Sequence, residues 1–399
     1  MPSDRDGQLE ALATSLLRAT ARLSGRLHPE TRRAVAEVVR PMNSYYSNRI
    51  EGHDTHPLDI ERAMRTDYAD DASRRDRQIE ARAHIEVHRW LSRAMDTADR
   101  LVPTRTDLLL EIHRRFYAEL PASMHRAEHR GGGHLVVTPG AFRCEEVEVG
   151  RHKGPMARAV PSFMDRFTAF YDPTAPGNRS LVRRIMLIAA SHHRFAWIHP
   201  FLDGNGRVAR LMSDAQFMYE DMDANCLWSV TRGLARDRAT YLDMLAAADS
   251  RRWNDHDGRG NLSDRGLADF CAFFLRTALD QVDYMTRILD LDAMNDRIGR
   301  YVERLGQQRG VRSEARFLLT DLHAKGRLTK QDAMRITNLS DKTLKDMVDG
   351  LKSMGMVRSE MRGRDMVYLP AYAVKSTPWL FPELYPSDRE ADLMREAMR

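Results

Sequence analysis

The chain has 399 residues, of which 42% are hydrophobic and 30% are charged, a balance typical of a globular protein large enough for two or three domains. The 62 basic and 57 acidic residues give a net charge of +5, too small by itself to indicate a nucleic-acid partner. No apolar run approaches the roughly 20 residues that cross a bilayer, which argues against a membrane protein. The N-terminus lacks the layout of a secretory signal, and three cysteines cannot all pair, so we expect a cytoplasmic location.

The N-terminal region, residues 1–98, is predicted to be helical throughout. Apolar residues recur at helical spacing through residues 7–40, where Pro29 opens a second helix and Pro41 follows it. Further helices are expected in chain order over about 40–50, 57–70, 72–97 and 104–119.

The stretch HRGGGHLVVTPGAFRCEEVEVGRHKGP, residues 129–155, departs from this pattern. Its glycines and prolines and the alternation in EEVEVG favour extended chain and a hairpin. Helical periodicity then returns, and the apolar segment 179–197 is predicted to be a buried central helix. Other helices are expected over 160–172, from about 205, and near 236–249 and 262–288. We assign residues 99–290 to one mainly α-helical core.

A domain boundary is expected within residues 290–312. The following sequence predicts helix, turn, helix, turn, helix and then a pair of strands around Gly363. This order is typical of a small winged helix-turn-helix domain, which we place at residues 300–371. The charged tail, residues 372–399, receives no functional assignment.

DNA binding is a candidate role for this C-terminal domain. Its predicted recognition helix carries Lys342, Thr343 and Lys345 near its start, where base and phosphate contacts are usually made. Three arginines would lie on the wing: Arg358, Arg362 and Arg364. Aspartates interrupt the positive face, so a protein-interaction or homodimer module is the alternative.

The twelve residues HPFLDGNGRVAR, 199–210, follow the central helix and open the next one. A glycine-containing loop that leads into a helix N-terminus offers unpaired N–H groups to an anion, and Gly204 and Gly206 allow close backbone approach. Arg207 and Arg210 lie three residues apart on one face of the new helix and can grip neighbouring phosphates. The stretch therefore predicts a polyphosphate site.

Two further side chains give this site chemistry. Asp203 would supply one hard oxygen ligand to Mg²⁺, which proteins commonly hold with one or two carboxylates and substrate phosphates. His199, with an ordinary pKa near about 6.5, would suit removal of a proton from an attacking hydroxyl. Asn205 can cap the new helix.

Each of these residues also has a commonplace explanation, as a structural histidine, a turn or a solvated arginine, and only the whole string favours a function. A metal site built from His192, His193 and His199 is a further alternative, weakened by spacings of six and seven residues.

The string HPFLDGNGRVAR resembles the signature of the Fic family, HPFx(D/E)GN(G/K)RxxR, at every defined position. The resemblance continues in HHRFAWI upstream and in ATYLDMLAAADSRR and LADFCAFFL downstream, and covers roughly residues 100–285. It implies a Fic helical core with a β-hairpin flap. Most enzymes of this family transfer AMP from ATP to a Ser, Thr or Tyr hydroxyl of a protein and release pyrophosphate.

The resemblance also implies roles within the motif. His199 would be the general base and Asp203 the Mg²⁺ ligand, while the loop Gly204, Asn205 and Gly206 would form the anion nest. Arg207 and Arg210 would grip the phosphates of ATP.

Outside the motif, the hairpin at about 140–155 resembles the flap of the family, which pairs with the target backbone like an added strand. Four flap residues would lie over the nucleotide: Val149, Gly150, Arg151 and His152. A tyrosine pair and an asparagine often border the adenosine in this family. The corresponding residues here are Tyr241, Leu242 and Asp249, so nucleoside recognition is less closely matched.

The sequence SNRIEG, residues 47–52, resembles the inhibitory motif of the family, (S/T)xxxE(G/N), through Ser47, Glu51 and Gly52. Read alone, it is a helix end with a solvated glutamate and a glycine stop. A Glu51 carboxylate paired with Arg210 would occupy the guanidinium that the γ-phosphate of ATP needs, and ATP would then bind in an unproductive pose. We therefore expect the isolated protein to be largely inactive.

The sequence thus predicts a self-inhibited, Mg²⁺-dependent protein adenylyltransferase that uses ATP. Some family members use the inhibitory glutamate to position water and remove AMP, which adds de-AMPylation as a second expected activity. The alternatives are a DNA-binding regulator whose Fic core senses nucleotide, and a Fic enzyme that transfers phosphate or another phosphoryl group. Tyr45 and Tyr46 are candidate self-modification sites, with packing as the other interpretation.

Overall fold

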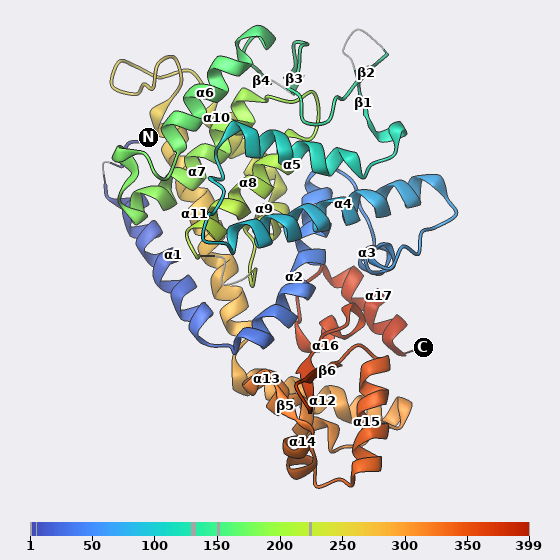
Figure 1. Ribbon diagram of the computed structural model, residues 1–399. Helices are drawn as coiled ribbons and strands as arrows, with labels where there is room; N and C mark the ends of the chain where they lie inside the picture. The colour runs from blue at the N-terminus through green and yellow to red at the C-terminus, as the bar shows by residue number, and fades with distance from the viewer. Residues whose placement is uncertain (1, 5, 129–132, 150–151, 223–225, 399) are drawn as a thin grey trace.

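The computed structural model describes residues 2–4, 6–128, 133–149, 152–222 and 226–398, and this part of the chain is mainly α-helical. Figure 1 shows a large helical body with the chain from α12 (Leu291–Arg309) onward gathered at one end. Two short hairpins lie at the opposite end, β1 (Arg126–Glu128) with β2 (His134–Val136) and β3 (Glu148–Val149) with β4 (His152–Lys153). Within the described residues, no helix is both long enough and apolar enough to span a membrane.

The N-terminal region is helical, as predicted, but its second helix is longer than expected. The helices are α1 (Gln8–Gly25), α2 (Pro29–Ile50), α3 (Pro57–Met64) and α4 (Ala72–Met95). The prediction of a helix end at Pro41 was wrong, because α2 continues through this proline. Most side chains of α2 after Pro41 are buried, and this packing outweighs the lost backbone hydrogen bond.

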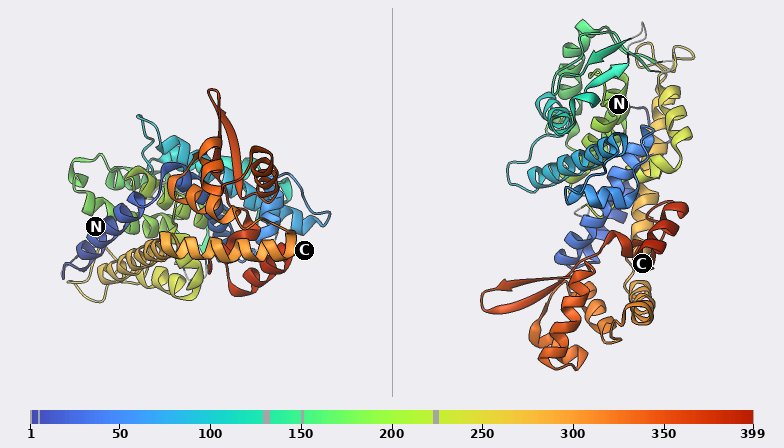
Figure 2. Two further views of the ribbon diagram at one scale, coloured as in Figure 1. Left: turned by 90° about the horizontal axis from the view of Figure 1, so that it is seen from below. Right: turned by 90° about the vertical axis from the view of Figure 1, so that its right-hand side faces the viewer.

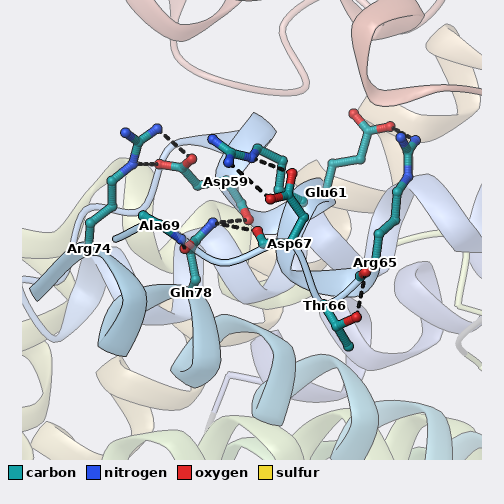
Figure 3. A network of polar contacts seen from close by, with 9 residues as sticks. Asp59, Glu61, Arg65, Thr66, Asp67, Ala69, Arg74 and Gln78 are labelled. Carbon is teal, nitrogen blue, oxygen red and sulfur yellow. Dashed lines mark hydrogen bonds and ion pairs between the residues drawn. The ribbon is translucent and has the colours of Figure 1, made fainter. Parts of the chain in front are cut away.

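Helices α3 and α4 are joined by a network of polar contacts, shown in Figure 3. The Arg74 guanidinium donates to both carboxylate oxygens of Asp59, at 2.7 and 2.6 Å. The Gln78 amide donates to the backbone oxygen of Asp59 at 3.2 Å and accepts from the backbone N–H of Ala69 at 2.7 Å. The network holds the N-terminal part of α4 against α3. Glu80, two residues after Gln78 on α4, contacts Arg207 of the helix that follows the loop at residues 199–204.

The central body is built around α7 (Leu181–Ile198), whose middle residues are buried as the sequence predicts. It packs against α8 (Asn205–Tyr219), α6 (Val160–Tyr171), α11 (Asp264–Ile288) and α1. The remaining helices of the body are α5 (Thr106–Ala118), α9 (Val230–Arg236) and α10 (Arg238–Ala248).

Two short antiparallel hairpins form where one was predicted. They are β1 (Arg126–Glu128) with β2 (His134–Val136), and β3 (Glu148–Val149) with β4 (His152–Lys153). The second coincides with the predicted flap. Gly150 and Arg151, which were predicted to lie over the nucleotide, fall outside the described residues.

The expected boundary at 290–312 is occupied by a continuous helix, α12 (Leu291–Arg309). Beyond it come α13 (Ala315–Lys325), β5 (Leu328–Thr329), α14 (Lys330–Thr337), α15 (Asp341–Ser353), β6 (Val357–Arg362) and β7 (Asp365–Pro370). The three strands form an antiparallel sheet in the order β5-β7-β6. Gly363 has φ 65° at the β6–β7 turn, a left-handed conformation that favours glycine. Figure 2 shows this hairpin projecting from the end of the molecule.

The tail forms α16 (Thr377–Leu380) and α17 (Ser387–Met398) and packs back on the N-terminal region. Arg389 of α17 forms an ion pair with Asp54. Asp392 lies 3.4 Å from His56, and the rings of Tyr385 and Tyr45 meet edge to face at 5.4 Å. The tail therefore contacts both α2 and the segment that follows it.

Candidate active site

Residues 199–204 form the turn between α7 and α8, and residues 205–210 open α8. Two left-handed residues shape the turn. His199 ends α7 with φ 50°, and Gly204 precedes α8 with φ 80°. The prediction that Asn205 caps α8 was wrong. Its side chain instead accepts from the backbone N–H of Phe201 at 2.9 Å and donates to the Phe201 oxygen at 2.8 Å, which closes the loop on itself.

The His199 imidazole is only partly exposed at the edge of this loop. Its Nδ1 lies 3.4 Å from the carbonyl oxygen of Ala196, which favours a proton on Nδ1 and leaves Nε2 to accept one. Burial, with smaller effects of the nearby charges of His152 and Arg143, lowers the pKa of His199 to about 4. This pKa lies below the ordinary value expected from the sequence, so the ring is neutral near pH 7.

Arg143 joins the base of the flap to the loop that begins at His199. Its backbone N–H donates to the oxygen of Pro200 at 2.9 Å, and its Nε donates to the oxygen of His199 at 2.8 Å. Its Nη2 donates to the oxygen of Pro155, beyond the hairpin, at 2.6 Å. Sequence reasoning did not single out Arg143, because one arginine in a hairpin carries no distinguishing pattern.

Asp203 is held in place by α5. The Tyr117 hydroxyl donates to Asp203 Oδ2 at 2.7 Å, and His113 Nε2 lies 3.2 Å from the Asp203 backbone oxygen. Among the described residues, the second carboxylate oxygen, Oδ1, has no hydrogen-bond partner. A partly exposed carboxylate with one oriented and one available oxygen fits a Mg²⁺ ligand. Tyr117 and His113 were missed because they lie about 90 residues away in the sequence.

The alternative metal site of three histidines does not form. His192 Nδ1 and Nε2 lie 2.8 Å from Ser213 Oγ and the Tyr241 hydroxyl, respectively. His193 Nε2 lies 2.9 Å from Asp249 Oδ1. In the described part of the chain, no three His, Cys, Asp or Glu side chains converge as metal ligands. The histidines before the motif therefore have hydrogen-bonding roles inside the helical body.

Arg210 of α8 is engaged by the end of α2. Its Nη2 donates to Glu51 Oε1 at 2.5 Å and to the Ser47 backbone oxygen at 3.1 Å, and its Nε donates to Ser47 Oγ at 3.0 Å. Although burial alone would raise the pKa of Glu51, the positive charges of Arg210 and Arg207 lower it. Glu51 is the C-cap residue of α2, and Gly52 follows with φ 89°. All three residues of the predicted inhibitory motif thus lie at the helix end that meets Arg210.

Gly206 makes room for this contact. A Cβ atom at position 206 would lie 2.4 Å from Glu51 Oε1 and 3.0 Å from Arg210 Nη1. The second glycine of the loop therefore admits the Glu51 carboxylate to the helix N-terminus where a phosphate was predicted to bind.

Arg207 is paired with a second carboxylate. It forms a buried ion pair with Glu80 of α4, and its guanidinium lies 5.3 Å from the ring centroid of Phe116. His53 Nδ1 lies 2.7 Å from the other Glu80 oxygen and 3.4 Å from Arg207 Nη2. The hydrogen bond to Glu80 raises the pKa of His53. Both predicted phosphate grips, Arg207 and Arg210, are thus bound by carboxylates of the N-terminal region.

Glu80→Gln is expected to destabilise the protein by about 3–5 kcal/mol, because the buried Arg207 would lose its ion-pair partner. The two side chains are 1% and 6% exposed. Urea unfolding monitored by circular dichroism would measure the change. Asp67→Asn, which removes the exposed ion pair between Asp67 and Arg62, is the matched control and should leave the midpoint near that of the unmodified protein. Equal midpoints for the two variants would contradict a supporting role for Glu80.

The predicted adenosine-bordering residues lie in different environments. Tyr241 is buried against His192, and burial raises its pKa to about 12. Leu242 is 40% exposed, and Asp249 is bound by two histidines. Tyr45 and Tyr46 are 1% and 2% exposed, which favours their interpretation as packing residues. In this conformation their hydroxyl groups are not accessible for self-modification.

Comparison with known proteins agrees with the motif. Residues 103–216 match the model of the Fic/DOC family. A "Protein adenylyltransferase Fic" of Nematostella vectensis is 32% identical over 112 residues, which are 28% of this chain and 22% of that protein. A protein of the same name from Culex quinquefasciatus is 26% identical over 175 residues, 44% of this chain and 31% of that protein. The chain therefore spans less than a third of the length of these curated relatives.

Solved structures show the same fold. A Fic family protein from Desulfovibrio desulfuricans G20 superposes with a TM-score of 0.52 at 17% identity, over 93% of this chain and 98% of that one. A Fic domain containing signaling protein from Bacteroides thetaiotaomicron gives a TM-score of 0.51 at 16% identity, over 69% and 95% of the two chains. The region that matches the Fic/DOC family model, residues 103–216, contains the complete motif at 199–210, and the mainly helical fold is shared with these solved structures.

Proposed function

We propose that this protein is a self-inhibited protein adenylyltransferase, which transfers AMP from ATP to a Ser, Thr or Tyr hydroxyl of a target protein. The names of its relatives suggest the reaction. The observation that carries the proposal is the placement of a neutral His199 next to the loop that opens α8. Asp203 lies in this loop, and Arg210 lies on α8.

In the proposed reaction, the target hydroxyl attacks the α-phosphorus of ATP and its proton passes to His199 Nε2. A new bond forms between the hydroxyl oxygen and the α-phosphorus, the bond to the bridging oxygen breaks, and pyrophosphate leaves. Backbone N–H groups at the start of α8 would hold the phosphates. Asp203, oriented by Tyr117, would hold Mg²⁺, which supplies positive charge to the phosphates when bound.

Inhibition would follow from the contact between Glu51 and Arg210. A γ-phosphate of ATP that bound Arg210 would have to displace the Glu51 carboxylate. This carboxylate already accepts the hydrogen bond from Arg210 Nη2 and lies against Gly206. An ATP molecule displaced from this position places its α-phosphorus outside attacking distance. The same carboxylate could orient water for the reverse removal of AMP, a second proposed activity of this site.

The test is intact-protein mass spectrometry after incubation with ATP and MgCl₂, with Glu51→Gly as the released variant. Adenylyl adducts on the Glu51→Gly protein, or on proteins of a bacterial lysate added to it, would support the proposal. Phosphoryl adducts would instead indicate transfer of phosphate. Unmodified protein in every sample would contradict adenylyl transfer.

The pH dependence of the Glu51→Gly enzyme should reflect the low pKa of its base. His199 accepts a proton only when neutral, so activity is retained above its pKa of about 4 and lost as the pH falls through that value. Titration of His199 should therefore contribute little change to kcat/KM for ATP between about pH 8 and pH 6. Radiolabel incorporation in a constant-ionic-strength buffer series would measure it. An acidic limb centred near the ordinary histidine pKa of about 6.5 would show that burial does not depress the His199 pKa.

DNA binding through the C-terminal domain is the second candidate. Lys342 and Lys345 are exposed at the start of α15, as that function requires. Other charges on this surface are engaged: Lys330 pairs with Asp341, and Arg362 of β6 pairs with Glu30 of α2 and with Glu360. Because these charges are already paired within the protein, they offer less to DNA phosphates. We therefore keep the enzyme as the principal proposed function.

A further inference from the structure

Three side chains, Asp249, His193 and His152, meet where the flap contacts the helical body. Asp249 is the C-cap residue of α10, His193 belongs to α7, and His152 belongs to strand β4 of the flap. Asp249 Oδ1 lies 2.9 Å from His193 Nε2, and Asp249 Oδ2 lies 3.1 Å from His152 Nδ1. One carboxylate thus links the flap to the central helix.

The partners of His152 define its protonation. Its Nδ1 faces the Asp249 carboxylate, and its Nε2 lies 2.8 Å from the backbone oxygen of Trp197. Both neighbours can only accept hydrogen bonds, so both nitrogens must carry protons for both contacts to form, and this ring is an imidazolium. His193 differs, because its Nδ1 is buried and has no hydrogen-bond partner among the described residues. A neutral His193 that donates from Nε2 accounts for its hydrogen bond to Asp249.

The surrounding charges agree with this assignment. Burial lowers the pKa of His152 and the positive charge of Arg143 opposes protonation, but the hydrogen bond and charge of Asp249 outweigh both and raise it. Burial would raise the pKa of Asp249, but hydrogen bonds from His152 and His193 lower it to about 2. Arg194 and Arg259 add positive charge near the same carboxylate. His199 also lies near His152, and the His152 charge helps to keep it neutral.

We propose that Asp249, acting through the imidazolium of His152, clasps strand β4 against the end of α7 and so positions the flap beside His199. Asp249 and His152 are positioning residues in this scheme, and their effect on AMP transfer rests on the function proposed above. The clasp closes when His152 is protonated. Because Asp249 raises the pKa of His152, the clasp is complete below the ordinary histidine pKa and opens as the pH rises through the raised value.

Hydrogen exchange of the flap tests the clasp without any nucleotide. Peptides that cover residues 145–155 would be followed at pH 6 and pH 8, after correction for intrinsic exchange, in the unmodified protein, Asp249→Asn and His152→Gln. The control is Asp243→Asn, an exposed acid on the same helix. Loss of a charged hydrogen bond should speed flap exchange about tenfold at pH 6 in both variants, and the unmodified flap should exchange faster at pH 8 than at pH 6. His152→Gln keeps the proposal testable if Asp249→Asn does not fold.

The rate of self-labelling with ATP in the Glu51→Gly background separates the clasp from the reaction. We expect both clasp variants to label about tenfold more slowly than the Glu51→Gly parent. Faster flap exchange without labelling in any variant, including the parent, would support the clasp and contradict the proposed function. Exchange that is the same in all variants and at both pH values would overturn the clasp, whatever the labelling.

Discussion

His199→Ala is expected to reduce AMP transfer by the Glu51→Gly protein by at least about 100-fold, because a positioned general base contributes about 10²–10⁴ to such a step. The imidazole is neutral near pH 7 and carries its available lone pair on Nε2. Alanine would leave the proton of the attacking hydroxyl without an acceptor. Quantification of adenylyl adducts over time, with ATP well above its dissociation constant, would measure the loss.

The Glu51→Gly background matters for this comparison, because the proposed inhibition by Glu51 would otherwise hide the effect of His199. ATP affinity should stay close to that of the parent, since phosphate binding is assigned to α8 and not to the imidazole. His256→Ala, an exposed histidine in the loop after α10, is the matched control. Labelling by His199→Ala at the rate of this control would rule out His199 as the base.

Glu51→Gly is expected to raise self-labelling by about 10-fold to 100-fold over the unmodified chain. A hydrogen bond between charged groups contributes about 1.5–3 kcal/mol, and each 1.36 kcal/mol removed from a barrier is worth tenfold in rate. Glycine removes the carboxylate that holds Arg210 and frees the space beside Gly206. Initial rates with labelled ATP would measure the change.

Two further variants show whether the charge or the bulk of Glu51 inhibits. Glu51→Gln keeps the size of the side chain and loses its charge, so it should be intermediate. Arg49→Ala alters an exposed residue in the same helical turn and should remain as inactive as the unmodified protein. A Glu51→Gly protein no more active than Arg49→Ala would show that this contact does not inhibit.

Much of this site could be predicted from sequence, because its parts are local. The left-handed Gly204, the helix start at Asn205 and the carboxylate of Asp203 all lie within one continuous string. The contact between Glu51 and Arg210 spans 159 residues, and it was expected only through resemblance to a known inhibitory motif. Helical periodicity in turn located most helices of the body.

The residues that sequence reasoning missed act across the fold. Glu80 and Tyr117 look like ordinary members of amphipathic helices, and only packing brings them to Arg207 and Asp203. The continuity of α2 through Pro41 was missed for a related reason, since local propensity predicts a break that burial of the helix overrides. Asn205 was misassigned as a cap because its spacing to Phe201 allows a closer loop contact.

The position of Glu51 at the C-cap of α2 means that release from the proposed inhibition needs only a small conformational change. Helix ends fray at small free-energy cost, and the Glu51 side chain is already 30% exposed, whereas Glu80 lies within α4 and is 1% exposed. Unwinding a single turn near Ile50, whose carbonyl oxygen accepts from Arg238 at 2.7 Å, would withdraw the carboxylate and leave the rest of α2 in the core. A partner that relieved the proposed inhibition would need to bind only the short connection between α2 and α3.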